Sequence, residues 1–138
     1  MSLIHDFFLC DKEHIDYRIN HGGIEMDDDL IRYMSDSLKW IDTEWNELDN
    51  NKNGLNYFGM TIFRGESLSE LVNIIKGWIE VFKNAPARFL LTVDYDIDSG
   101  LYEKKEFEKV KVVDQMTEVL EMCGKAQVSN KVLVHAGI

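Results

Sequence analysis

The chain contains a single proline, only two cysteines and no low-complexity run. The absence of biased segments argues against intrinsic disorder. Cys10 and Cys123 are too few for a disulfide framework and form no CxxC pair. Because both stand among apolar neighbours, we expect reduced thiols in the core. With 138 residues, 45% of them hydrophobic, the chain has the size and composition of a single domain, residues 1–138, with a substantial core.

Basic residues are also scarce, because 15 Lys and Arg oppose 25 Asp and Glu and leave a net charge of −10. A negative field repels phosphate backbones, so we expect no nucleic-acid partner. The excess lies mainly in residues 1–54, with 13 acids and 5 bases, whereas residues 55–138 hold 12 acids and 10 bases. A basic partner protein would be attracted to this acidic N-terminal third. An acidic surface also serves solubility alone, and that alternative stays open.

No apolar run is long enough to span a membrane. The first residues, MSLIHDFFLCDKEH, have a short apolar patch with no basic region before it. They predict neither a signal peptide nor a membrane anchor. We therefore expect a cytoplasmic protein with no membrane contact.

Motifs for nucleotide and metal chemistry are missing, since P-loop, GxGxxG and HExxH patterns do not occur. Residues 49–54, DNNKNG, match the first six positions of an EF-hand calcium loop. The match then fails, because Met60 stands where such a loop requires a bidentate Glu. We interpret this segment as a polar connection between a helix and a strand. The sequence predicts no metal site and no cofactor.

A second near match to a calcium loop begins at Asp94 and continues with Asp96 and Asp98. Its last position is Lys105, which cannot ligate a cation. Three carboxylates on one side of a strand repel each other, so we expect Lys104 and Lys105 on the following strand to supply counter-charge. An acidic contact surface or a solvated hairpin explains this pattern better than a metal site.

The four histidines, His5, His14, His21 and His135, show no metal-ligand spacing. His135 stands in an apolar C-terminal segment. A structural histidine with satisfied hydrogen bonds is commoner there than a catalytic base, since a base must first be shown within reach of a substrate proton. No catalytic residue is predicted, and the protein is not expected to be an enzyme.

The acidic third has the pattern of a strand followed by a helix. Ile15, Tyr17 and Ile19 alternate with polar residues, as in a short strand. Residues 27–29 are aspartates suited to cap a helix, and apolar residues then recur at steps of three and four through residues 28–48. The predicted buried seam of this helix consists of Ile31, Met34, Leu38, Ile41, Trp45 and Leu48.

The remainder, residues 55–138, alternates between strand and helix patterns. The predicted elements are a strand at 55–63, a helix at 67–82, a hairpin at 89–108, a helix at 112–127 and a strand at 131–138. This β-α-β-β-α-β order predicts an α+β fold of ferredoxin-like type. We expect the strands at 55–63 and 131–138 to be neighbours, because both are apolar on both faces. The helix at 28–48 is expected to cover the opposite face of the sheet.

A second stripe on the predicted first helix combines aromatic and acidic side chains. Tyr33, Trp40, Glu44 and Glu47 lie beside the apolar seam, and Asp49 follows at its end. Aromatic anchors among acids are typical of protein-binding faces, so we predict these five residues as the partner-binding site. The alternative is that Tyr33 and Trp40 only widen the buried stripe.

Residues 55–138 also resemble a known class of proteins as a whole. The resemblance rests on LNYFGMTIF, IIKGWIEVFKNAPARFLLT, DYDIDSGLYEKKEFEK and the terminal VLVHAGI. The chain resembles small acidic immunity-type proteins encoded beside bacterial polymorphic or contact-dependent toxins. That resemblance implies a stoichiometric inhibitor that masks a toxin domain in the cytoplasm, and it implies no catalytic residues. The acidic N-terminal third would suit a basic toxin, such as a nuclease.

Two other functional classes remain open. One is a ligand-sensing or oligomer-forming module, which rests on analogy with ferredoxin-like domains that associate through their sheets. The other is a small enzyme with a site around His135 and the hairpin. A pocket with convergent polar groups favours an enzyme, and a large isologous apolar interface favours an oligomer.

Overall fold

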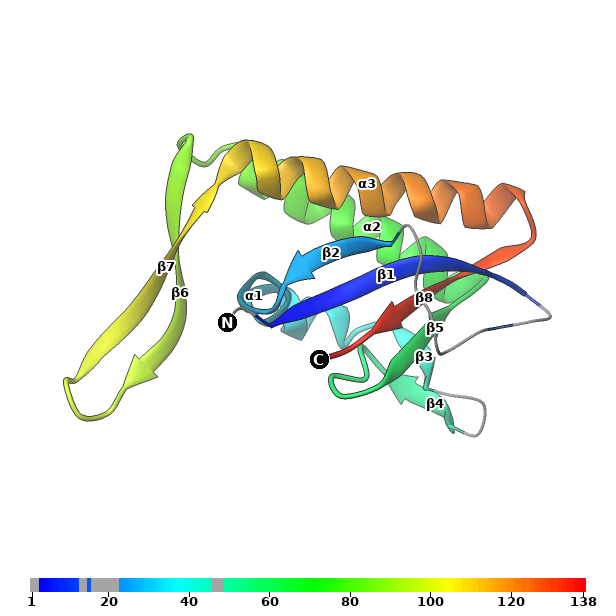
Figure 1. Ribbon diagram of the computed structural model, residues 1–138, viewed down its shortest axis with the longest axis horizontal. Helices are drawn as coiled ribbons and strands as arrows, with labels where there is room; N and C mark the ends of the chain where they lie inside the picture. Colours follow the sequence, from blue (N-terminus) through cyan, green and yellow to red (C-terminus); the bar gives the residue numbers. More distant parts are fainter. Residues whose placement is uncertain (1–2, 13–14, 16–22, 46–48) are drawn as a thin grey trace.

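The computed structural model describes residues 3–12, 15, 23–45 and 49–138, and it shows a mixed α+β chain with an antiparallel sheet and three helices (Figure 1). The elements in chain order are β1 (Ile4–Asp11), β2 (Ile24–Asp27), α1 (Asp28–Leu38), β3 (Asp42–Trp45), β4 (Asp49–Asn53), β5 (Met60–Phe63), α2 (Glu66–Phe82), β6 (Arg88–Asp96), β7 (Leu101–Glu108), α3 (Lys109–Val128) and β8 (Lys131–Ala136).

The main sheet has six strands in the order β2-β1-β8-β5-β3-β4. β8 is central and pairs antiparallel with β1 on one side and with β5 on the other. The registers place Phe7 and Thr61 opposite His135, so these three side chains share one face of the sheet. The prediction that the strands around 55–63 and 131–138 are neighbours is confirmed, although β5 itself is shorter than predicted.

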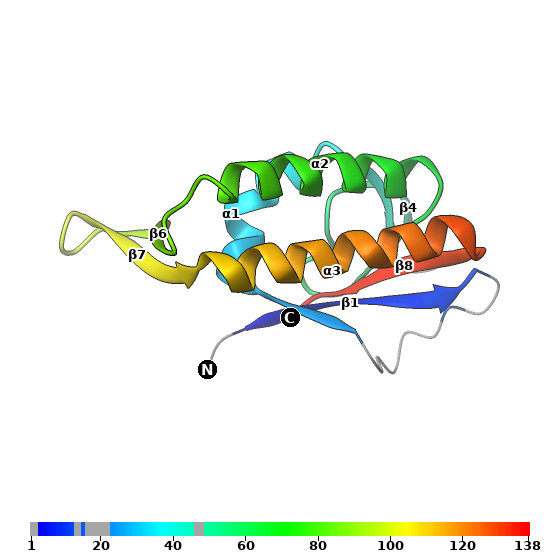
Figure 2. The same cartoon turned by 90° about the horizontal axis from the view of Figure 1, so that it is seen from above.

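All three helices contribute to one large core on a single face of the sheet. α2 and α3 lie side by side over this face (Figure 2), and Ile31 of α1 belongs to the same buried cluster as Leu71 of α2 and Met116 of α3. The prediction that the first helix covers the opposite face is therefore wrong. An amphipathic helix packs wherever apolar surface is offered, and here α1 fills the end of the layer next to α2 and β6.

The opposite face of the sheet has a smaller core of its own. Phe8, Ile62, Val132 and Val134 form a buried cluster there, at 0–3% exposed. Partly buried residues complete it, namely Cys10, Ile15, Met60 and Ala136. The double burial of β5 and β8, which their apolar faces predicted, is thus observed.

The hairpin of β6 and β7 is a separate two-stranded sheet that projects from the body (Figure 1). A ferredoxin-like fold would place these two strands inside the main sheet beside the strand at 55–63. That position is occupied instead by β3, which pairs with β5 through Glu44 and Ile62. The ferredoxin-like order of the elements is present, but the four-strand sheet of that fold is not formed.

The first helix ends ten residues earlier than the apolar seam predicted. α1 stops at Leu38, and the chain then forms an antiparallel hairpin of β3 and β4. The predicted polar connection at residues 49–54 is thus mostly strand β4. The helix began as predicted, since the Asp27 carboxylate accepts a hydrogen bond from the Asp29 amide at 2.8 Å. Ile41 follows Leu38 at a helical spacing of three residues, but it lies after the turn that ends α1. It is buried without being part of the helix.

The later elements agree with their predictions within a few residues. α2 begins at Glu66 rather than Ser67, because Gly65 takes the N-cap position with φ 58° and no side-chain cap. β1 and β2 were not predicted, and the strand predicted around residues 15–19 lies outside the described residues except for Ile15.

Candidate protein-binding surface and buried histidine network

The predicted partner-binding residues divide between exposed and paired positions. Tyr33 on α1 and Trp40 just after it are 43% and 75% exposed, so they do not widen the buried stripe. Glu44 lies on β3 and Asp49 begins β4, where it pairs with Trp45 across the hairpin. Glu47 lies outside the described residues.

Trp40 lines a shallow apolar groove between α1 and α2. The groove has a volume of about 440 Å³, and its lining consists of Ser37, Trp40, Asn73, Ile74, Gly77, Trp78 and Val81. Val81 is itself 55% exposed. Large apolar side chains gathered at a solvent-facing groove are the usual anchors of a protein interface.

The floor of this aromatic groove is held in place from both sides. The Trp78 indole N–H donates a hydrogen bond to Ser37 Oγ at 2.8 Å. The Tyr33 ring meets the Trp78 ring edge-on at 5.6 Å, and Phe82 stacks on Trp78 at 5.7 Å. Tyr33 and Trp40 therefore flank one rigid indole, and a rigid anchor loses little conformational entropy on binding.

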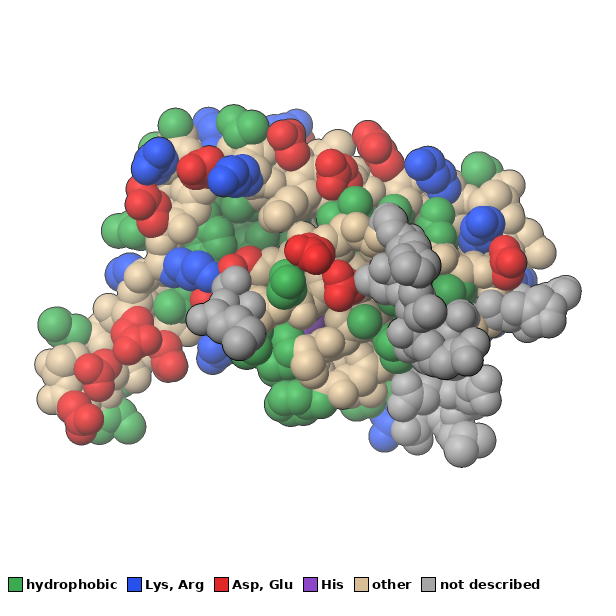
Figure 3. Space-filling model, viewed as in Figure 1, with side chains coloured by type: hydrophobic (Ala, Val, Ile, Leu, Met, Phe, Trp, Pro, Cys, Tyr) green, Lys and Arg blue, Asp and Glu red, His purple; other side chains and the backbone are tan. Residues whose placement is uncertain are grey.

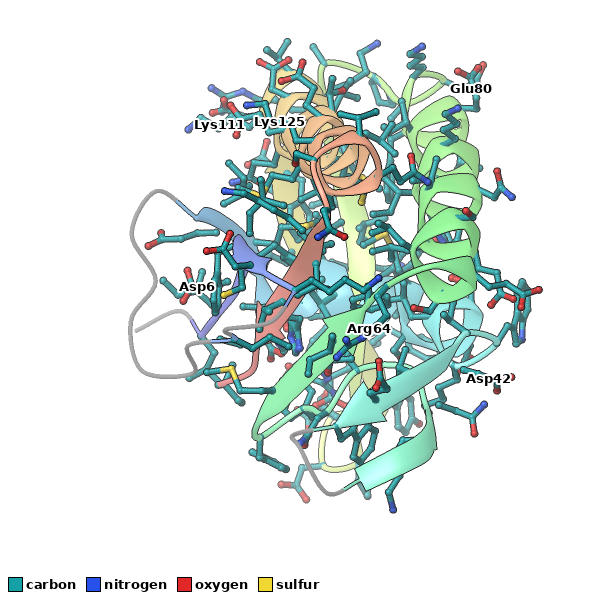
Figure 4. All side chains as sticks on the ribbon, turned by 90° about the vertical axis from the view of Figure 1, so that its right-hand side faces the viewer. Asp6, Asp42, Arg64, Glu80, Lys111 and Lys125 are labelled. Atoms are coloured by element: carbon teal, nitrogen blue, oxygen red, sulfur yellow. The ribbon has the colours of Figure 1, made fainter. Side chains whose placement is uncertain are left out.

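A second groove, at the start of α2, is acidic. Its volume is about 280 Å³, and it is lined by Asp42, Thr43, Glu44, Arg64, Glu66, Ser67 and Glu70. Among the residues described as lining this groove, Arg64 is the one base, and its Nε donates to Glu44 Oε2 at 2.7 Å. Figure 4 shows Arg64 and Asp42 on the same side of the molecule. Glu44 is thus partly neutralised, whereas Asp42, Glu66 and Glu70 add to the negative field.

One side of α2 connects the two grooves. Glu66, Glu70, Ile74, Gly77 and Val81 follow each other at steps of three and four, which places them along one stripe of the helix. We refer to this stripe, together with Tyr33, Trp40 and Asp42, as the α1–α2 surface. It contains Tyr33 and Trp40 of the predicted site, Glu44 lies in the adjoining acidic groove, and α2 supplies residues that the sequence did not single out.

The projecting hairpin exposes apolar and acidic side chains toward its tip (Figure 3). Its exposed large hydrophobic residues are Leu90, Tyr95, Ile97, Leu101 and Tyr102, at 48–86% exposed. An isolated two-stranded hairpin is marginally stable in water, so its base must be fixed to the body.

Lys105 supplies one fixing point for the hairpin. Its ammonium bonds to Asp27 at 2.6 Å and to Asp29 at 3.1 Å, at the N-terminus of α1. Burial opposes the charge, but these two hydrogen bonds outweigh it and raise the pKa of Lys105. Lys104 instead donates to Thr92 within the hairpin. The prediction that Lys104 and Lys105 neutralise the aspartates near the turn is therefore wrong.

A chain of hydrogen-bonded side chains runs through the core beneath α1. His5 Nδ1 lies 2.8 Å from His135 Nε2, and His5 Nε2 lies 2.8 Å from Asp28 Oδ1. His135 Nδ1 continues the chain to Thr61 Oγ1 at 3.2 Å, and the Tyr57 hydroxyl bonds to Asp28 at the other end. Both imidazoles are 0% exposed. The strands β1, β5 and β8 and the first turn of α1 are joined by this network.

The direction of the hydrogen bonds to Asp28 follows from the donors available. The Asp28 carboxylate accepts from the Tyr57 O–H and the His5 Nε2–H. His135 is hydrogen-bonded through Nε2 to His5 and through Nδ1 to Thr61, and its tautomer decides which of these nitrogens donates. Burial, and secondarily the neighbouring His5, lowers the pKa of His135 to about 3, so this imidazole is neutral at pH 7.

Tyr57 is the member of the network nearest to solvent. Burial first, and then the hydrogen bond to Asp28, raises the pKa of Tyr57 to about 12. His135 and Thr61 have no exposed surface, so no substrate reaches them in this conformation. The hydrogen bonds of this arrangement satisfy its buried polar groups.

A scan against protein-family models and searches of curated proteins and of solved structures found no match to this chain. Among the described residues, no helix combines the length and the apolar character needed to cross a membrane. The same residues contain no group of three or more His, Cys, Asp or Glu arranged to hold a metal ion.

The sequence contained a signal for the histidine network that our interpretation did not use. His5 alternates with Phe7 and Leu9, and His135 alternates with Leu133, so both histidines occupy inward positions of strands. A buried histidine needs a polar partner. Which partner it finds depends on strand order, and His5 and His135 are separated by 130 residues.

Proposed function

We propose that this chain is a protein-binding domain that acts as an immunity-type inhibitor, masking a basic toxin domain by direct binding through the α1–α2 surface. The observation that carries the proposal is Trp40, which stands 75% exposed at a groove floored by the immobilised Trp78. A solvent-exposed indole beside a preformed apolar groove is the type of anchor that dominates binding energy in protein interfaces.

Charge supports a basic partner. Asp42, Glu66 and Glu70 line the acidic groove at one end of the α1–α2 surface, and the aromatic groove occupies the other end. Such an arrangement separates two tasks: the acids attract a cationic partner over long range, and the aromatics hold it at contact. A stoichiometric inhibitor of a toxin needs both fast association and slow dissociation.

The test begins with a pull-down from the native host, followed by association kinetics of the purified partner at two salt concentrations. The paired reversal Glu66→Lys/Glu70→Lys should slow association several-fold and weaken its salt dependence. Trp40→Ala should leave the association rate nearly unchanged and speed dissociation at least tenfold. Glu44 is a poorer choice for reversal, because its loss also breaks the pair with Arg64.

Matched controls come from α3, where Glu118→Lys/Glu121→Lys makes the same charge change on exposed positions of another helix. If these reversals act as strongly as those on α2, net charge rather than the α1–α2 surface governs association. Ile97→Asp at the hairpin tip gives a further comparison. Loss of binding by that variant alone would show that the partner contacts the hairpin rather than the α1–α2 surface. Co-expression with the partner should restore host growth, and a partner that is not toxic would refute the inhibitor assignment.

A further inference from the structure

A second cavity lies between α1 and the β3–β4 hairpin, separate from the α1–α2 surface. Its volume is about 460 Å³, within the usual range for small-molecule sites. Apolar side chains form much of its wall, namely Ile31, Leu38, Trp45 and Leu55. Polar groups from α1, the turn after it, β4 and the following loop complete it, namely Arg32, Ser35, Lys39, Asn53 and Tyr57.

The charged side chains at this cavity are basic, although the chain as a whole is acidic. The net charge is −10, yet the residues described as lining the cavity include two bases and no carboxylate. Arg32 and Lys39 are only loosely paired on their helix, at 3.8 Å from Asp29 and 4.0 Å from Asp36. Contacts of this length at the surface contribute little, so both cations remain available to a ligand.

The wall opposite α1 is fixed before any ligand binds. The Trp45 indole N–H donates to Thr43 Oγ1 at 3.1 Å and to the Gly54 carbonyl at 3.0 Å. Gly54 itself takes a φ of 67°, and a Cβ there would lie 3.1 Å from Lys39 Cα, so only glycine fits without strain. The hairpin is thereby held against the end of α1, and the site is preorganised.

We propose that this cavity binds a small amphipathic anion, a carboxylate with an apolar chain, whose charged group lies between Arg32 and Lys39. The apolar chain packs against Trp45 and Leu55. Arg32 can receive a carboxylate through two parallel N–H groups, and Lys39 adds a point charge. The Tyr57 hydroxyl is not expected to donate to the anion, because it already donates its proton to Asp28.

The experiment uses the purified chain and octanoate, below its micellar concentration, with binding measured by calorimetry and by chemical-shift changes of assigned amides. Octanol, which has the same chain without the charge, is the matched probe. We expect 1:1 binding of octanoate, with shifts in α1 and β3–β4, and binding of octanol at least tenfold weaker. Arg32→Gln and Lys39→Gln should each weaken octanoate binding about tenfold, which corresponds to about 1.4 kcal/mol.

Lys76→Gln removes a positive charge from an exposed position of α2 outside the cavity lining and serves as the control variant. It should bind octanoate like the wild type. Equal binding of octanol and octanoate would overturn the anion assignment. Octanoate binding that survives both cavity substitutions, or no binding of octanoate at all, would overturn the site. Trp40→Ala should not change octanoate affinity, so the outcome is independent of the proposed protein-binding surface.

Discussion

The two buried histidines provide the sharpest test of how this fold is held together. In His135→Leu, His5 Nδ1 and the Thr61 hydroxyl each lose a hydrogen-bond partner, both at positions that are 0% exposed. An unsatisfied buried polar group costs about 1–3 kcal/mol, so the free energy of unfolding should fall by about 2–4 kcal/mol. In His5→Leu, the buried Asp28 carboxylate loses its imidazole donor, and the expected cost is about 3–5 kcal/mol.

The double variant distinguishes a coupled network from two independent sites. Once His5 is leucine, His135 Nε2 has already lost its hydrogen-bond partner, so replacing His135 removes a group whose burial has become unfavourable. The cost of His5→Leu/His135→Leu should therefore be smaller than the sum of the single costs by about 1–3 kcal/mol. The measurement is urea unfolding at pH 7, followed by tryptophan fluorescence and by circular dichroism.

A control cycle uses Val119→Ala and Val134→Ala, since these buried residues belong to different core clusters. Their costs should add within about 0.5 kcal/mol. Equally additive behaviour of the two histidine substitutions would refute the inference that the hydrogen bond between His5 and His135 couples them in the folded state.

The remaining predictions concern titration, the hairpin and the buried thiol. Because the pKa of His135 is about 3 in the folded chain and near 6.5 when unfolded, only the unfolded state gains its proton between these values. Its contribution to the free energy of unfolding is complete above pH 6.5 and is lost as pH falls toward 3, by up to about 1.4 kcal/mol per pH unit. In His135→Leu, the free energy of unfolding measured from pH 6.5 to 4.5 should therefore depend less on pH than in the wild type. An unchanged pH dependence would contradict the lowered pKa of His135. Lys105→Met should speed amide hydrogen exchange in β6 and β7, while α2 and α3 keep their protection. Lys104→Met should leave exchange in β6 and β7 unchanged. Equal effects of the two substitutions would mean that the bonds from Lys105 to Asp27 and Asp29 do not anchor the hairpin. Burial raises the pKa of the Cys123 thiol to about 12, so a disulfide reagent should label it at pH 8 only after urea is added, and fast labelling of the native chain would show that this part of α3 opens.

Local pattern was sufficient for the elements whose stability comes from one continuous amphipathic face. α2, the β6–β7 hairpin, α3 and β8 all lie where apolar periodicity predicted them. α2, α3 and β8 each present a complete apolar face to the core, whereas the hairpin buries only Phe89, Leu91 and Phe107. The exposure of Tyr33 and Trp40 also agrees with their position beside the seam rather than within it.

Tertiary structure decided what periodicity could not. The apolar residues after Leu38 kept a helical spacing, yet β3 pairs with β5 on one side and with β4 on the other. Two or three apolar residues at such spacing fit a turn and a short strand as well as a helix, and the gain from pairing outweighs a weak local preference. The same pairing takes the place that the β6–β7 hairpin would hold in a ferredoxin-like sheet, so the hairpin is left projecting.

The residue types of the chain determined its charge, its lack of known motifs and the apolar faces of its central strands. The histidine network arose only from the fold, because it joins residues that are 130 positions apart. The cation-lined cavity lies within residues 31–57, but it forms only because the chain turns back on α1 after Leu38. A hydrogen bond between His5 and His135 depends on β1 and β8 pairing in one register, and a shift of one residue would turn each side chain to the other face of the sheet. Periodicity reports which face of an element is apolar, whereas register and strand order determine which side chains meet, and those depend on the packing of the whole chain.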